Sequence, residues 1–501
     1  MANQQHQDEI LAQYSLDVHG MNVLITISKT LDFVPLYSVS FQGVGLPTRL
    51  LLTSLRPELI AMVPIDPSQI SRKEYMEKIN AKYLEASTLL IDKYLPGTDI
   101  QTKQRLTAYI LNIMLGMGDL EVLMTDGNLE EIAVNGARNP TWVFHNTLGW
   151  CKTTVMSDSD EFIYENSSRI GRQVGRQINT LTPLMDAEMA DGSRVNATLF
   201  PISQVGNTIT IRKFSKSPWT MPMMIDNSTI SAELASVVWL CIQSEISLLI
   251  SGGTASGKTS FLNATGIFFP ASRRIISVEE TKELALPGFL QWIPMITRQP
   301  NPEGKGEVSL YDLMINALRQ RPDIMVVGEV RTGKDAETLF EAIHTGHAVY
   351  GTVHADNAQD TVIRMTNPPI NVPKIMINGI GGIIVNFRHR VRGIRRVLEM
   401  AEVLRTGDAN VLYKWNTRDD TFSIISEMTN LADTIMLYTG LTRKEIAEDI
   451  AEKARIMKWM TKQKIFDVND AGNVVSNYYR NKSAVLDLVE NDASFSKDLL
   501  K

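Results

Sequence analysis

Gly252-Gly-Thr-Ala-Ser-Gly257-Lys258-Thr259 follows the apolar stretch Ser247–Ile250 and precedes a helical pattern at Thr259–Gly266. The glycines allow the backbone to wrap around a phosphate, so that amide hydrogens face the anion at the positive end of a helix. In the phosphate-loop motif, a lysine placed like Lys258 reaches the β- and γ-phosphates, and a hydroxyl placed like that of Thr259 binds Mg²⁺. A chance glycine-rich turn is the alternative, but the strand and the helix both stand where the motif requires them. The stretch predicts an ATP and Mg²⁺ site formed by Gly252, Gly253, Thr254, Ala255, Ser256, Gly257, Lys258, Thr259 and Ser260.

Apolar stretches typical of buried strands recur on both sides of this loop, with helical patterns between them. They lie at Ser247–Ile250, Ile275–Val278, Ile324–Val327 and Ala348–Val353. This alternation is typical of a mainly parallel sheet that is covered by helices. The sequence therefore predicts an α/β fold.

The length of 501 residues is too great for a single ordinary core, so several domains are expected. We expect an N-terminal domain at 1–98, a second α/β domain at 99–214, a linker at 215–229, an ATPase domain at 230–401 and a helical C-terminal domain at 402–501. The second domain is expected to contain strands at Arg194–Leu199 and Thr208–Phe214.

The composition is ordinary for a globular protein, with 44% hydrophobic and 21% charged residues. The net charge of −6 argues against a protein whose main task is to grip DNA, so no direct nucleic-acid partner is expected. Cys151 and Cys241 are too few for a disulfide framework or a four-cysteine zinc site, which fits a reducing cytosol. Met1–Ser15 lacks the order of a signal peptide, and no apolar run approaches the ~20 residues of a spanning helix. We therefore expect no integral membrane segment.

Acidic residues follow two of the predicted strands. Glu329 ends Ile324–Val327, where a carboxylate downstream of a phosphate loop can hold Mg²⁺ directly or through water. Glu279 and Glu280 end Ile275–Val278, and adjacent side chains there point in opposite directions. One of the two could polarise the attacking water as a general base, or both could form a solvated strand end.

Two histidines bracket the predicted strand Ala348–Val353, His347 before it and His354 after it. Exposure to solvent is the ordinary explanation for such residues. Ligands nevertheless sit at the ends of strands in open parallel sheets, so a γ-phosphate sensor at His354 is plausible.

Taken in order, these elements resemble the secretion and pilus traffic ATPases, a family that includes type II secretion, type IV pilus, type IV secretion and archaellum motor ATPases. The boxes of that family correspond to Walker A at Gly252–Thr259, an aspartate box at Ile276–Glu283, Walker B at Ile324–Glu329 and a histidine box at Gly346–His354. The aspartate box of the family commonly reads Glu-Asp, whereas this chain has Glu279-Glu280. The resemblance assigns the general base to Glu279, with Glu280 as the second choice.

Two strings look like the archaeal branch of the family, which assembles the archaellum and related pili. They are Asn301-Pro-Glu-Gly-Lys-Gly-Glu307 and Thr366-Asn-Pro-Pro-Ile-Asn-Val-Pro373.

The resemblance implies a RecA-like ATPase domain that hydrolyses ATP to ADP and phosphate. It also implies a homo-hexamer, a polytopic inner-membrane platform protein as partner and an accessory ATP-binding regulator. The protein would be cytoplasmic and would lie at the inner face of the cell membrane through that partner. In such a ring, Arg194 or Arg212 of one subunit would complete the site of its neighbour. Surface charge is the alternative explanation for both arginines.

Two other functions are compatible with the same motifs. One is a DNA-transfer ATPase of a conjugation-like system, and the other is a non-hydrolysing ring scaffold that only binds ATP. The most basic run, Arg388–Arg396, could contact lipid headgroups or nucleic acid, but a strand pair with an exposed basic face explains it better.

Overall fold

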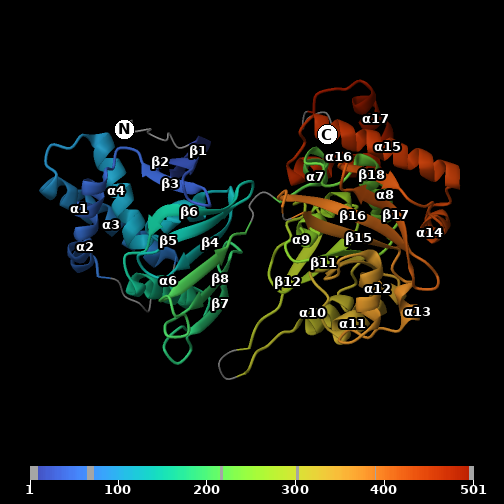
Figure 1. Ribbon diagram of the computed structural model, residues 1–501, viewed down its shortest axis with the longest axis horizontal. Coiled ribbons are helices and arrows are strands. Elements are labelled where there is room, and N and C mark those ends of the chain that lie inside the picture. The colour runs from blue at the N-terminus through green and yellow to red at the C-terminus, as the bar shows by residue number, and fades with distance from the viewer. Residues whose placement is uncertain (1–8, 65–72, 215–217, 301–303, 390, 496–501) are drawn as a thin grey trace, which may run out of the picture. The chain divides into compact units, whose positions relative to one another are not determined.

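The computed structural model describes residues 9–64, 73–214, 218–300, 304–389 and 391–495. The chain forms two compact units, unit 1 at 1–216 and unit 2 at 217–501 (Figure 1). Parts of several expectations lie outside the described residues, namely the N-terminal segment before residue 9, residues 215–217 of the linker, residues 301–303 of one archaeal-like string and Arg390 of the basic run. The finer division into five domains stays a prediction, and its boundaries at 98/99 and 401/402 fall within the two units.

Unit 1 is built on a mixed sheet with the strand order β1-β2-β3-β6-β5-β4-β9-β8-β7. Its strands are β1 (Glu9–Val18), β2 (Met21–Lys29), β3 (Leu36–Phe41), β4 (Leu129–Asn135), β5 (Pro140–His145), β6 (Gly149–Met156), β7 (Leu184–Glu188), β8 (Arg194–Thr198) and β9 (Thr208–Arg212). The strands expected near 194–199 and 208–214 are therefore confirmed as β8 and β9. Neighbouring strands are antiparallel except β3 and β6, which are parallel.

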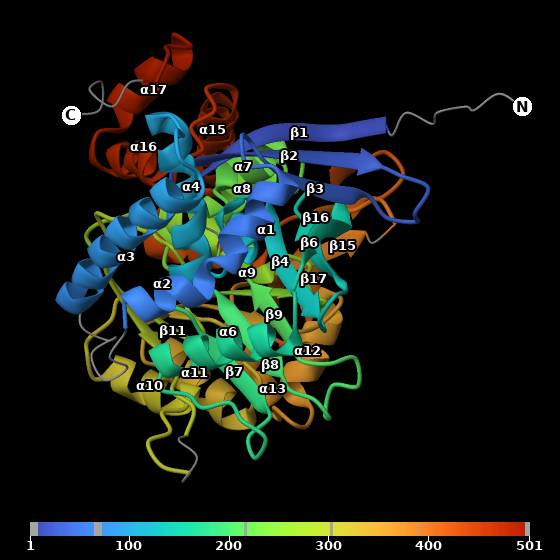
Figure 2. The same ribbon diagram turned by 90° about the vertical axis from the view of Figure 1, so that its left-hand side faces the viewer.

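Helices cover one face of this sheet. They are α1 (Leu46–Ser54), α2 (Arg56–Met62), α3 (Lys73–Tyr94), α4 (Ile100–Leu115), α5 (Leu120–Thr125) and α6 (Asp160–Gln173). Alternate residues of β2, namely Val23, Ile25 and Ile27, are fully buried in one core together with residues of these helices. Figure 2 shows α1–α4 gathered beside β1–β3.

Unit 2 contains the sheet that the sequence predicts, with the strand order β12-β11-β13-β14-β10-β15-β16-β17-β18. Its strands are β10 (Leu248–Gly252), β11 (Arg274–Glu279), β12 (Gln291–Ile296), β13 (Ile324–Val327), β14 (Ala348–Val353), β15 (Gly382–His389), β16 (Ile394–Val403), β17 (Ala409–Asn416) and β18 (Thr421–Ile424). From β12 to β15 neighbouring strands are parallel, and β16 to β18 extend the sheet in antiparallel pairs. The predicted α/β class with a mainly parallel sheet is confirmed.

The central strands of unit 2, β10, β11, β13 and β14, bury both of their faces. Along β13, Ile324 and Val326 belong to one core, whereas Met325 and Val327 belong to the core on the other side. Helices therefore cover the sheet on both faces, as Figure 1 shows. They are α7 (Met221–Asp226), α8 (Ala232–Gln243), α9 (Lys258–Thr265) with the short 3₁₀ turn η2 (Gly266–Phe268), α10 (Leu310–Leu318), α11 (Gly333–His344), α12 (Ala358–Thr366), α13 (Lys374–Ile377), α14 (Asn430–Thr439), α15 (Arg443–Lys462), α16 (Val468–Arg480) and α17 (Lys482–Glu490).

The C-terminal helices begin and end where the sequence provides caps. Thr442 and Glu445 form a reciprocal capping box at the start of α15, with each side chain bonding the other residue's backbone N–H. The buried face of α15 packs against α7 and α8, so the helical region shares a core with the parallel sheet. In the part of the chain that the structure describes, no helix is both long and apolar enough to cross a membrane.

Candidate active site

The loop between β10 and α9 has the backbone conformation of a tight anion-binding turn. Gly252 and Gly257 have φ values of 147° and 93°, and Ala255 is left-handed at 59°. A Cβ at position 252 would lie 2.3 Å from the carbonyl oxygen of Asn386, so only glycine fits there. Gly257 is the N-cap of α9, and no side chain caps the amides of that helix, which leaves them for a ligand.

Lys258 lies inside this loop with only 8% of its surface exposed. Its ammonium group donates to the carbonyl oxygens of Gly252 (3.0 Å) and Gly253 (3.2 Å) and lies 3.3 Å from both ring nitrogens of His354. Burial lowers the pKa of Lys258, and the nearby carboxylates of Glu329 and Glu283 partly oppose this effect. The cation is therefore fixed at the turn where the sequence predicts a phosphate.

Glu329 follows β13 and is joined to the loop through His354. Its Oε1 lies 3.1 Å from His354 Nε2, and its Oε2 accepts a 2.8 Å hydrogen bond from Arg331. Burial alone would raise the pKa of Glu329, but the hydrogen bond and charge of Arg331, with His354 and Lys258, hold the pKa below its ordinary value. Burial and the charge of Lys258 lower the pKa of His354, which favours a neutral ring. Three of the predicted site residues, Lys258, Glu329 and His354, are thus in contact.

Glu280 is paired with Arg331 and not left to solvent. One guanidinium nitrogen of Arg331 donates to both carboxylate oxygens of Glu280, at 2.8 and 2.6 Å. The other terminal nitrogen holds Glu329. Arg331 therefore links the ends of the neighbouring strands β11 and β13.

Glu279, in contrast, is buried, and only one of its two carboxylate oxygens accepts hydrogen bonds. Its side chain is 2% exposed, and its Oε1 accepts from the amides of Glu283 (2.9 Å) and Leu284 (3.1 Å). Among the residues that the structure describes, its Oε2 has no hydrogen-bond partner. Burial raises the pKa of Glu279 to about 7. A carboxylate with a pKa near neutrality and one free oxygen has the properties of a general base.

The loop that holds Glu279 is tied to the phosphate-loop helix. The amide of Ala285, next to Leu284, donates to Asn263 of α9 at 2.8 Å. A Cβ on Gly328, at the end of β13, would come within 3.4 Å of the Glu279 side chain. Glu279 therefore lies beside the strand end that carries Glu329.

The hydroxyl groups of the predicted site belong to the loop and to the first turn of α9. Thr259 and Ser260 are partly buried, and the buried hydroxyl of Ser256 has no hydrogen-bond partner. Within the described residues, no group of three or more His, Cys, Asp or Glu side chains could hold a metal by itself. Mg²⁺ typically takes one or two protein oxygens and completes its shell with phosphates and water. The Thr259 hydroxyl and the Glu329 carboxylate are ligands of the required type.

Arg194 and Arg212 both lie in unit 1. They occupy directly opposite positions on β8 and β9, and Glu131 of β4 lies opposite Arg212 on its other side. The structure therefore places the two predicted arginines together. Their action on a neighbouring subunit stays a prediction.

Sequence reasoning missed the contacts of three residues with this site. Besides Arg331, Asn386 donates to the carbonyl oxygen of Gly257 at 3.1 Å, and Arg395 donates to that of Ala255 at 3.3 Å. Arg395 belongs to the basic run, which forms the β15–β16 hairpin next to β10. Its neighbour Arg396 is buried and paired with Asp420, so the basic run is not simply a solvated strand pair.

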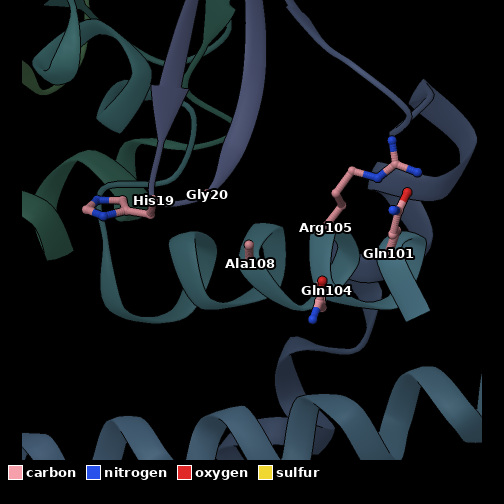
Figure 3. Close-up of a pocket in the computed structure, with 6 residues that line it drawn as sticks. All are labelled: His19, Gly20, Gln101, Gln104, Arg105 and Ala108. Carbon is pink, nitrogen blue, oxygen red and sulfur yellow. The ribbon is translucent and has the colours of Figure 1, made fainter.

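Unit 1 has a separate polar pocket of about 420 Å³, shown in Figure 3. It is lined by His19, Gly20, Gln101, Gln104, Arg105 and Ala108. His19 and Arg105 point away from each other, so they do not converge on one ligand atom (Figure 3). The pocket offers no arrangement for catalysis.

Comparison with known proteins connects this geometry to one family. Residues 177–385 match the family model described as "Type II/IV secretion system protein". A protein of Methanocaldococcus jannaschii is 31% identical over 378 residues, which cover 73% of this chain and 68% of that protein. A second protein of the same organism is 33% identical over 352 residues, which cover 68% of this chain but only 46% of the longer relative.

Among solved structures, the Legionella pneumophila ATPase DotB is similar at 17% identity with a TM-score of 0.43. The match covers 71% of this chain and 92% of DotB. A likeness of this size supports no inference about function.

Proposed function

Because this chain belongs to the type II/IV secretion system protein family of traffic ATPases, we propose that it hydrolyses ATP to ADP and phosphate and uses the energy as a motor of a secretion, pilus or archaellum system. The observation that carries the proposal is the contact chain from Lys258 through His354 to Glu329, beside the buried carboxylate of Glu279. Phosphoryl transfer needs a cation in a glycine-rich loop, a nearby acid and a general base. Lys258, Glu329 and Glu279 are residues of these three types.

Lys258 and the amides at the start of α9 bind and orient the phosphates of ATP. Lys258 must exchange its contacts with the loop carbonyl oxygens for contacts with phosphate oxygens, because an ammonium group has only three hydrogens to donate. The Thr259 hydroxyl and the Glu329 carboxylate would hold Mg²⁺, which when bound neutralises charge on the β- and γ-phosphates. His354, in contact with both Lys258 and Glu329, would sense the γ-phosphate.

Glu279 is the general base in this proposal. It accepts a proton from the attacking water through Oε2, the water oxygen bonds to the γ-phosphorus, and the bond from that phosphorus to the β–γ bridging oxygen breaks. ADP takes the electron pair of that bond, and inorganic phosphate is the second product. A pKa of about 7 lets Glu279 take the proton near neutral pH and release it afterwards.

The finer parts of the proposal rest on the family. We infer a homo-hexamer in which Arg194 or Arg212 acts on a neighbouring subunit, and a polytopic membrane platform protein that receives the work. An accessory ATP-binding regulator and a cytoplasmic location at the inner face of the membrane belong to the same inference. The matches to M. jannaschii proteins favour the archaeal branch.

A phosphate-release assay on the purified oligomer tests the proposal. Lys258→Ala should lower turnover by at least about 10²-fold, the loss typical when one stabilising donor is removed. Lys334→Ala, which truncates a lysine of α11 outside the site, is the matched control and should retain turnover. ATP binding without phosphate release by the wild type would instead identify a ring scaffold. Salt-dependent binding of DNA by the wild type would favour the DNA-transfer alternative.

A further inference from the structure

We propose that Arg331 is a positioning residue that holds Glu329 while the nucleotide site is empty and competes with Mg²⁺ for that carboxylate, with Glu280 as the anchor of Arg331. This inference rests on the proposed function, because it gives Glu329 a partner that must be exchanged when ATP binds. It also gives Glu280 a role different from that of a general base.

The side-chain contacts leave no carboxylate oxygen of Glu329 free. Its Oε2 is taken by Arg331 at 2.8 Å and its Oε1 by His354 at 3.1 Å. Each oxygen can accept more than one hydrogen bond, but a cation or its bound water cannot occupy the direction that a guanidinium already fills. Mg²⁺ therefore approaches a carboxylate that already has two partners, one of them the positively charged guanidinium of Arg331, which competes with it.

The backbone around Glu329 is fixed on both sides, so the side chains are the parts that can exchange. The amide of Gly328 donates to Val278 of β11 at 2.9 Å, and the amide of Val330 donates to Thr352 of β14 at 2.9 Å. The Thr352 hydroxyl also donates to the carbonyl oxygen of Gly328. A loop held in this way cannot move Glu329 toward a ligand as a whole.

The fork of Arg331 explains how it can release one partner and keep the other. One terminal nitrogen contacts both oxygens of Glu280, and the second contacts Glu329. The exposed fractions of the side chains are 51% for Arg331, 39% for Glu280 and 19% for Glu329. When Mg²⁺ binds, Arg331 gives up its bond to the more buried Glu329. Glu280 meanwhile keeps the guanidinium group of Arg331 at the ends of β11 and β13. A lysine cannot bridge two carboxylates in this fork geometry.

The competition predicts effects of opposite sign on the need for Mg²⁺. Arg331→Gln removes the competitor and should lower the Mg²⁺ concentration for half-maximal effect by about threefold, a size typical of a partly exposed ion pair. Glu280→Gln removes the anchor, leaves Arg331 to Glu329 alone and should raise that concentration by about threefold.

Simple long-range electrostatics would give the same two signs, so the double variant is the decisive one. If Glu280 acts through Arg331, Glu280→Gln should have almost no effect in an Arg331→Gln background, and the double variant should match Arg331→Gln. If the charges act independently, the two effects should add and cancel. Arg331→Lys keeps the charge without the fork, and its Mg²⁺ requirement should fall between those of the wild type and Arg331→Gln.

The experiment measures equilibrium binding of a fluorescent ADP analogue to the full-length protein at increasing Mg²⁺, with an EDTA arm. Lys334→Gln removes one positive charge of α11 and should behave like the wild type. The inference is supported if the two single variants shift the half-maximal Mg²⁺ concentration in opposite directions and the two shifts do not add in the double variant. Additive shifts, or shifts in the same direction, overturn it. Absence of nucleotide binding in every arm, including the wild type, would instead refute the proposed function.

Discussion

Glu279 should make the protein less stable as the pH rises, because the native state holds this carboxylate away from water. In the folded protein its pKa is about 7, against an ordinary value of 4.5. The interval of about 2.5 pH units corresponds to roughly 3 kcal/mol, at 1.36 kcal/mol per unit. The unfolded chain releases the proton near pH 4.5 and the native chain near pH 7, so the native state binds more protons between these values. Stability contributed by the protonated form is therefore complete below pH 4.5 and is lost as the pH rises through 7.

Glu279→Gln tests this directly, because the amide keeps the shape and the acceptor for the two loop amides but cannot ionise. Relative to the wild type, the variant should gain stability progressively from pH 5 to pH 8. A gain of roughly 3 kcal/mol corresponds to about 6 °C in the melting temperature of a large domain. Thermal unfolding without nucleotide, followed by tryptophan fluorescence at both pH values, measures the difference, and any effect of packing is the same at both.

The same variant should have lost its turnover, since the base is absent, while it still binds ATP. In the wild type, turnover should fall below pH 7 and reach about a tenth of its plateau at pH 6, because only the ionised base accepts the proton. Glu280→Gln is the matched control and should show a much smaller change in stability with pH. If the melting temperatures of Glu279→Gln and the wild type differ by the same amount at pH 5 and pH 8, the burial argument for Glu279 is wrong.

Three further outcomes are expected. Glu329→Gln should retain ATP binding in an EDTA buffer but lose turnover, because the amide keeps the size and not the charge; undiminished phosphate release would remove Glu329 from the site. A mixture of two inactive proteins, Lys258→Ala and Arg212→Ala, should regain turnover in mixed oligomers, because one intact site can form from a sound lysine and a sound arginine; the mixture with Arg194→Ala tests the second arginine, and no recovery in proven mixed oligomers would exclude action in trans. The purified protein should float with liposomes only when a polytopic partner is present, and tight binding to neutral liposomes alone would contradict this.

The phosphate loop and the parallel sheet were predictable because their signals are local. The spacing of glycines from Gly252 to Gly257 fixes the turn, and apolar runs such as Ile324–Val327 mark strands buried on both faces. Boundaries were predicted to within a few residues, as for α9, which spans Lys258–Thr265 where the helical pattern suggested Thr259–Gly266. Helix ends fray in this way because the last carbonyl groups lack intrahelical partners.

The residues alone did not show which of Glu279 and Glu280 is buried, and only the family resemblance favoured Glu279 as the base. The two residues are adjacent, and their surroundings differ because Glu280 has a partner far along the chain. Glu280 meets Arg331, which lies 51 residues away, whereas Glu279 turns into the protein and meets amides of the loop that follows it. The structure confirms a strand pair at the basic run, but the burial of Arg396 was not predictable, since its partner is Asp420, on the turn between the next two strands. Long-range pairing decides such roles, and a single sequence does not contain it.

Arg194 and Arg212 were predicted as two alternative arginines that could complete a neighbouring site. The structure shows that they lie opposite each other on β8 and β9. Two arginines directly opposite each other on antiparallel strands repel, and such pairs cost stability unless an anion lies nearby. Each arginine has a carboxylate as its other cross-strand neighbour, Glu131 of β4 opposite Arg212 and Glu188 of β7 opposite Arg194. Among the residues that the structure describes, the buried Nε of Arg194 finds no hydrogen-bond acceptor. A phosphoryl group gathers negative charge on three oxygens during transfer, so it can accept hydrogen bonds from two guanidinium groups at once. If the proposed action on a neighbouring subunit holds, the adjacent positions favour joint action of Arg194 and Arg212, and substitution of either arginine should weaken the contribution of the other.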